Sequence, residues 1–69
     1  MYDVICKLKN DTIEYFNMGK REVNEIIEDL LNTYVFEIVN VNTKKRYIII
    51  NKQSVKDFYT SEKFKKGDV

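Results

Sequence analysis

The chain has 69 residues, which is enough for one small domain. Its 12 basic and 11 acidic side chains nearly balance, so strong non-specific binding to nucleic acid, which relies on clustered Lys and Arg, is not expected. A single cysteine excludes an intrachain disulfide, and the absence of histidine removes the usual nitrogen ligand for zinc. A lone core in a chain below about 70–80 residues rarely supplies more than ~3–5 kcal/mol. Self-association is therefore the remaining means of adding stability.

Residues 1–4 contain neither a basic segment nor a long apolar run, so we expect no signal peptide. The apolar run Ile48–Ile50 is far too short to span a membrane. We therefore expect the protein in the cytoplasm, and in the host cytoplasm if a phage encodes it. The chain lacks proline and is rich in Asn, Lys and Ile. This bias is typical of AT-rich genomes such as those of low-GC bacteria and their phages.

Apolar and polar side chains alternate along residues 2–9, a period that predicts a β-strand. Residues 10–11 are Asn and Asp, which tolerate positive φ, so we expect a two-residue turn there and a second strand over residues 12–17. This turn would set Cys6 opposite Tyr15.

Residues 20–32 are predicted to form an amphipathic helix, because apolar side chains recur at helical spacing. Acidic residues near its end run against the helix dipole. Either packing outweighs this small cost, or the acidic end is a contact surface for a partner. The candidate partner-binding residues on this helix face are Glu25, Glu28 and Asp29.

Residues 34–41 and 46–50 are rich in β-branched and aromatic types, which predicts a second hairpin. We expect Val39 opposite Ile48, and apolar side chains on both faces of this hairpin. Residues 54–60 fit either a third strand, which would continue the second hairpin as a meander, or a short helix, and we favour the strand. The helix alternative rests on helical spacing of apolar residues and on a capping box formed by Ser54 with the residue three positions later.

The sequence thus predicts an α+β fold. We expect a small antiparallel sheet in the order ββαββ plus a C-terminal strand or short helix, with one amphipathic helix packed on one face. Residues 1–61 form a single domain in this interpretation, and residues 62–69 form a polar, disordered tail.

One helix of this length covers one face of a small sheet, so the other face should remain available for self-association. The alternative is that the C-terminal segment folds as a helix and covers that second face. The expected oligomer face consists of Ile5, Phe16, Val39, Ile48 and Ile50.

The sequence contains no clear set of catalytic residues, and we expect neither an enzyme nor a bound cofactor or metal. General acid–base chemistry at neutral pH usually uses His, which is absent. Cys6 alternates with core positions and is interpreted as a small buried hydrophobe. The two glycines form no phosphate-binding loop. A basic turn over residues 42–47 is the candidate site for a phosphate or nucleotide, with Lys44, Lys45, Arg46 and Tyr47 as its residues.

The hypothesis that these observations favour is a small non-enzymatic binding protein of the phage or mobile-element type. It would act as a stoichiometric inhibitor or adaptor of a host protein, including inhibitors of host defence. The alternative is an oligomeric nucleotide- or nucleic-acid-binding protein that uses the basic turn. A third hypothesis is a structural subunit of a larger assembly. Membrane partners are not expected.

Overall fold

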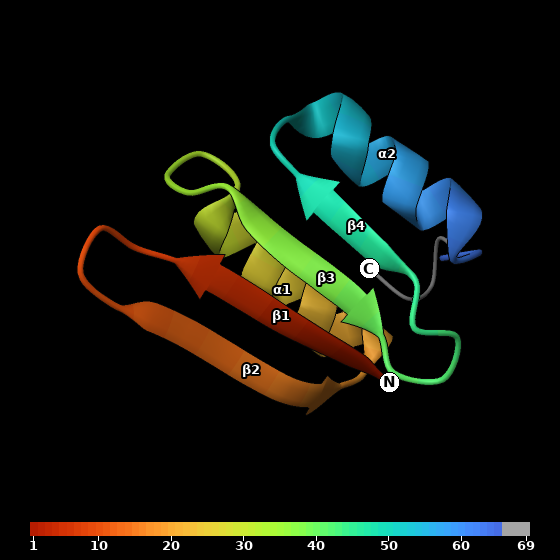
Figure 1. The fold of residues 1–69 in the computed structure, drawn as a ribbon. Helices are drawn as coiled ribbons and strands as arrows, with labels where there is room; N and C mark the ends of the chain where they lie inside the picture. The colour runs from red at the N-terminus through yellow and green to blue at the C-terminus, as the bar shows by residue number, and fades with distance from the viewer. Residues whose placement is uncertain (66–69) are drawn as a thin grey trace.

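The computed structural model describes residues 1–65, which form a four-stranded antiparallel sheet and two helices (Figure 1). The strand order is β2-β1-β3-β4, so the N-terminal strand lies in the interior of the sheet. The α+β class expected from the sequence is confirmed. The elements are β1 (Tyr2–Lys7), β2 (Thr12–Met18), α1 (Lys20–Leu30), β3 (Phe36–Asn40), β4 (Arg46–Ile49) and α2 (Lys52–Ser61).

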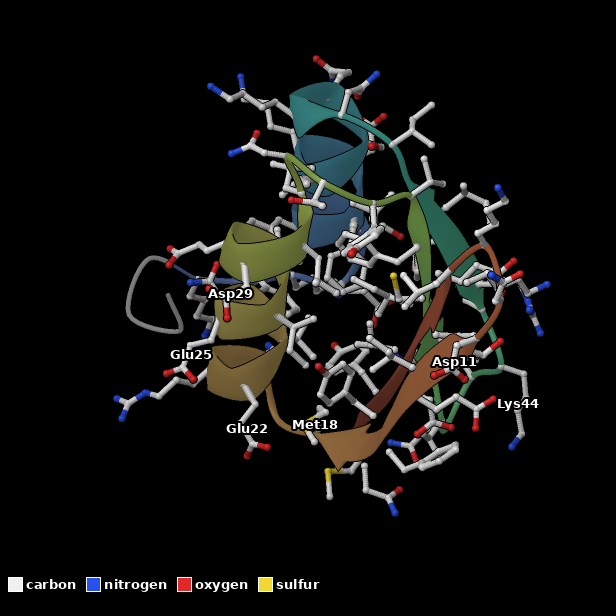
Figure 2. The ribbon with its side chains drawn as sticks, turned by 90° about the vertical axis from the view of Figure 1, so that its left-hand side faces the viewer. Asp11, Met18, Glu22, Glu25, Asp29 and Lys44 are labelled. Atoms are coloured by element: carbon white, nitrogen blue, oxygen red, sulfur yellow. The ribbon has the colours of Figure 1, made fainter. Side chains whose placement is uncertain are left out.

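Both helices pack on the same face of the sheet, as the side view in Figure 2 shows. The helix α1 contributes Val23 and Ile27 to the core, and α2 contributes the fully buried Phe58. Burying one such side chain is worth about 1.5–3 kcal/mol. We call this side of the sheet the helical face and the opposite side the outer face. Because α2 packs on the helical face, the alternative in which it covers the second face is wrong.

The first hairpin has a different register from the one expected. Cys6 pairs with Ile13 and not with Tyr15. The Leu8 N–H donates to the Asp11 carbonyl at 2.8 Å, so the two-residue loop consists of Lys9 and Asn10, one residue earlier than expected. The shift is two residues, and a shift of two preserves the face on which every side chain lies. The pattern of apolar residues therefore could not distinguish the two registers.

A β-bulge interrupts β2 near its end, where the register slips between the pairs of Val4 and Tyr2. Asn17 adopts a left-handed conformation with φ of 56°, which asparagine tolerates better than most residues. Its backbone N–H donates to the Asp3 carboxylate at 3.0 Å. After the bulge, Met18 lies opposite Tyr2, and both side chains pack with the core.

The second hairpin is also shifted by two residues from the expected register. Val39 pairs with Arg46, and Ile48 pairs with Glu37. The face assignments are unchanged, since Ile38 is buried on the helical face while Val39 and Ile48 lie on the outer face.

The preference for a strand over residues 54–60 is wrong, because this segment lies within α2. The helix begins earlier than the Ser54 capping box would place it. Asn51 is the N-cap, and its side chain accepts a hydrogen bond from the Ser54 N–H at 2.9 Å. The Ser54 hydroxyl accepts in return from the Asn51 N–H at 2.9 Å. This reciprocal pair satisfies two backbone donors at the helix start.

The segment 62–65, expected to belong to a disordered tail, instead packs against the core. Lys63 takes a left-handed conformation with φ of 57° and reverses the chain after α2. The Phe64 N–H then donates to the Tyr59 carbonyl at 2.9 Å, and the two rings stack at 4.6 Å between centroids. This is the Schellman motif with its accompanying apolar contact, formed without glycine. Residues 66–69 lie outside the described part of the chain.

Candidate functional site

The outer face of the sheet carries neither helix, and its side chains alternate between apolar and charged types. In one row across the strands, Ile5 of β1 lies between Glu14 of β2 and Glu37 of β3, and Ile48 of β4 follows Glu37. No two apolar residues are adjacent within this row. This face is therefore less continuously apolar than the sequence interpretation assumed.

A second row on the outer face continues the alternation. Asp3 of β1 pairs with Val39 of β3, which in turn pairs with Arg46 of β4. Phe16, 56% exposed, lies at the bulge opposite Asp3. Apolar side chains thus meet along diagonals, where the spacing of about 7–8 Å still permits contact between long side chains.

The charges of the outer face differ in how they are compensated. Arg46 and Glu37 form an ion pair at 2.6 Å. Glu14 makes no ion pair with any residue in the described range 1–65, and Asp3 accepts only the backbone hydrogen bond at the bulge. The part of the outer face over β1 and β2 therefore combines exposed apolar groups with uncompensated carboxylates.

A second exposed surface lies at the end of the β3–β4 pair. Because Phe36 pairs with Ile49, the residues just before β3 and just after β4 lie at the same end of the sheet (Figure 1). Four large exposed hydrophobic side chains lie there, and a charged residue borders them, since Glu37 pairs with Ile48 in the sheet. We call this surface the apolar corner; it consists of Tyr34 (38% exposed), Val35 (57%), Ile48 (48%) and Ile50 (56%).

The expected oligomer face is therefore divided into two parts. Ile48 and Ile50 belong to the apolar corner, whereas Ile5, Phe16 and Val39 lie among the charges of the outer face. The sequence interpretation placed Tyr34 and Val35 inside a strand and did not name them as surface residues. Their position next to a strand boundary was the one feature of the sequence that could have indicated their exposure.

A half-buried carboxylate fastens the C-terminal end of α2 to the sheet. Glu62 accepts hydrogen bonds from the Tyr2 hydroxyl at 3.0 Å, from the Asn40 side-chain amide at 2.5 Å, and from the Tyr47 hydroxyl. Burial raises the pKa of Glu62. The hydrogen bonds from Tyr47, Asn40 and Tyr2, together with the nearby charge of Lys45, lower the pKa by more than burial raises it. The net result is a pKa below the ordinary value, so the group is ionised at neutral pH. Sequence reasoning missed this cluster because it assigned Glu62 to a tail.

The basic turn is ordered by the same amide that contacts Glu62. The Asn40 side-chain oxygen accepts hydrogen bonds from the backbone N–H groups of Asn42 at 2.9 Å and Thr43 at 3.0 Å. Lys44 then takes a left-handed conformation with φ of 65°. The cations Lys44 and Lys45 are exposed at the tip of this turn.

The structure does not bring the candidate phosphate-binding residues together. Arg46 and Tyr47 are neighbours on a strand and point to opposite faces. Arg46 is paired with Glu37 on the outer face, while the Tyr47 hydroxyl contacts Glu62 and lies 2.9 Å from the Ser61 hydroxyl. Burial and the contacts with Glu62 raise the pKa of Tyr47. An anion at Lys44 would therefore meet neither side chain without loss of existing contacts.

The acidic residues of α1 are all exposed, as expected. Figure 2 shows Glu25 and Asp29 on the side of α1 that faces away from the sheet. Glu28 accepts a hydrogen bond from the Asn24 side chain at 3.4 Å, and Asn24 in turn accepts one from the Tyr59 hydroxyl of α2. Burial and the charge of Glu28 raise the pKa of Tyr59. The last turn of α1 contains no basic residue.

The described residues 1–65 enclose no pocket and contain no group of His, Cys, Asp and Glu side chains arranged to hold a metal ion. Cys6 is fully buried, as expected, and burial raises the pKa of its thiol. Neither helix within this range is long and apolar enough to cross a membrane.

Comparisons of this chain with protein-family models, with curated proteins and with solved structures found no match.

Proposed function

We propose that this protein binds a host protein in a stoichiometric complex and catalyses no reaction. In this role it acts in the host cytoplasm as an inhibitor or adaptor of the phage or mobile-element type, of which defence inhibitors are one kind. The observation that carries the proposal is the open part of the outer face over β1 and β2, where Phe16 and Ile5 lie beside the uncompensated carboxylate of Glu14.

The chemistry of this surface specifies the chemistry of the partner. Exposed apolar side chains favour contact with apolar groups, and the carboxylates of Asp3 and Glu14 favour Lys or Arg beside them. A partner without cations would leave these carboxylates desolvated and unpaired, which is costly. The occupant that fits is therefore a protein surface in which apolar residues alternate with basic ones.

The test compares three tagged proteins: the wild type, Phe16→Glu, and Glu25→Lys as a control on the opposite side of the molecule. Each is used to capture proteins from a lysate of a low-GC bacterium, and a captured candidate is then purified and titrated calorimetrically. We expect saturable 1:1 binding to the wild type and to Glu25→Lys, and binding at least about tenfold weaker to Phe16→Glu, which removes an exposed aromatic anchor.

Equal binding by Phe16→Glu would contradict the location of the site. Loss of binding in Glu25→Lys alone would move the site to the acidic face of α1, where Glu28 and Asp29 also lie. If no captured protein shows saturable binding to the wild type, the proposed function is wrong.

A further inference from the structure

We propose that the apolar corner is the interface of a symmetric dimer, and that its occupant is the apolar corner of a second copy of this chain. The corner is the surface within residues 1–65 where four large exposed hydrophobic side chains lie at one end of the β3–β4 pair, and the charged residue opposite Ile48, Glu37, is paired with Arg46. The inference does not depend on the proposed host partner.

Charge distribution selects a second copy over other occupants. A two-fold axis brings each surface patch against itself, so any charge near the axis meets the same charge. A dimer centred on the outer face over β1 and β2 would oppose Glu14 and Asp3 with their own copies. The corner avoids this cost, because the carboxylate nearest to Ile48 in the sheet is Glu37, which Arg46 already neutralises at 2.6 Å.

The size of the corner sets the strength of the dimer. A standard stable interface buries about 800 Å² on each partner. Four side chains that are roughly half exposed supply less than that, on the order of the few hundred Å² that the largest apolar patch of a monomer covers, and such patches are often functional. We therefore expect a weak, concentration-dependent dimer with a dissociation constant of about 10–1000 μM.

The geometry leaves the proposed partner surface free. The apolar corner lies at the β4 edge of the sheet, whereas Phe16 lies on β2 at the other edge. Dimerisation at the corner would therefore display two copies of the β1–β2 surface. One edge of the sheet would then bind the second copy, and the other edge would bind the host partner.

Sedimentation equilibrium of Ile50→Glu and Phe16→Glu tests this assignment with a matched pair, because both side chains are 56% exposed. We expect the wild type and Phe16→Glu to approach twice the monomer mass as concentration rises to about 1 mM. Ile50→Glu places a charge near the axis and should weaken the dimer at least about tenfold.

A concentration series of ¹H–¹⁵N spectra of the wild type gives a second measurement that needs no variant. Shifts that move with concentration at Val35, Ile48 and Ile50, and not at Phe16, support the corner. A wild type that stays monomeric at about 1 mM overturns the proposal. So does a dimer that Phe16→Glu disrupts and Ile50→Glu does not.

Discussion

At the scale of single residues, Glu62 has the largest structural role of any charged side chain in the described chain. Its three hydrogen-bond donors come from β1, from the end of β3 and from β4. One carboxylate therefore joins three strands to the end of α2. Hydrogen bonds to a charged group contribute about 1.5–3 kcal/mol each when well formed, and partial exposure reduces this.

The lowered pKa of Glu62 predicts a dependence of stability on pH. A carboxyl group with a lower pKa in the folded than in the unfolded state stabilises the fold above its unfolded pKa, and this contribution is lost as pH falls through the folded value. We expect the free energy of unfolding, measured by urea denaturation, to decrease from about pH 5 towards pH 3. In Glu62→Gln it should be lower by about 1–2 kcal/mol at pH 7 and should vary less with pH.

The control for this prediction is Glu25→Gln, which alters an exposed carboxylate on α1. It should leave both the free energy of unfolding at pH 7 and its dependence on pH near the wild-type values. A Glu62→Gln variant with the wild-type slope would show that other carboxylates produce the acid sensitivity.

At the scale of elements, the end of α2 is closed by a residue type that does not favour the required conformation. Lys63 occupies the left-handed position of the Schellman motif, where glycine has no steric penalty. We expect Lys63→Gly to raise the free energy of unfolding by about 0.5–1 kcal/mol in thermal or urea denaturation. Lys56→Gly, within the body of the same helix, should instead lower it by about 1 kcal/mol. Destabilisation by both changes would mean that Lys63 makes contacts that outweigh its backbone cost.

The elements also show how much the sequence could predict. The helix over residues 20–32 and the first strand followed from periodicity, and the second hairpin followed from its β-branched and aromatic residues. The helix α1 was found at Lys20–Leu30. Both hairpin registers were wrong by two residues, because a shift of two leaves the pattern of faces unchanged and only the turn distinguishes them. Each turn has the expected length but begins one residue earlier, at residues 9–10 in place of 10–11 and at residues 41–44 in place of 42–45.

The C-terminal segment was misread for two separate reasons. The apolar spacing of residues 54–60 indicated the helix that the structure shows, but the β-prone residues 58–60 and the turn-like residues 51–54 favoured a strand. The capping pair of Asn51 with Ser54 was overlooked in favour of one that began at Ser54. Glu62 and Phe64 were assigned to a tail because their neighbours are polar. Their positions depend on contacts with Tyr2 and Tyr59, which no local pattern reveals.

The candidate surfaces were predictable only in part. The sequence identified the uncovered sheet face and its apolar members, including Ile5 and Phe16. It did not show how charged residues from adjacent strands interrupt that face, because Glu14 and Glu37 come to flank Ile5 only through strand order and register. The apolar corner likewise depends on where β3 and β4 end.

At the scale of the whole molecule, α2 completes a core that the sheet and α1 cannot fill alone. Phe58 is fully buried and packs edge-on against Tyr2 and Tyr47, with ring centroids 5.7 and 5.0 Å away. Truncating a buried Phe to Ala costs about 3–5 kcal/mol, which is comparable to the ~3–5 kcal/mol that so small a core supplies. We expect Phe58→Ala to be largely unfolded at 25 °C by far-UV circular dichroism.

The matched control for that variant is Phe16→Ala, since Phe16 is exposed on the outer face. It should keep the wild-type spectrum and change the free energy of unfolding by no more than about 0.5 kcal/mol. A folded Phe58→Ala would show that the sheet and α1 are stable without the ring, and that α2 is an accessory layer.

The position of β1 in the interior of the sheet has a consequence for how the chain folds as it is made. The strand β1 pairs with β3, and its Tyr2 is hydrogen-bonded to Glu62, so these contacts join distant parts of the sequence. The contact between Tyr2 and Glu62 cannot form on the ribosome until Glu62 has left the exit tunnel. We therefore expect the fold to be completed late in synthesis, at a rate between those typical of helical bundles and of all-β domains. Because it contains no proline, no slow peptide-bond isomerisation delays that step.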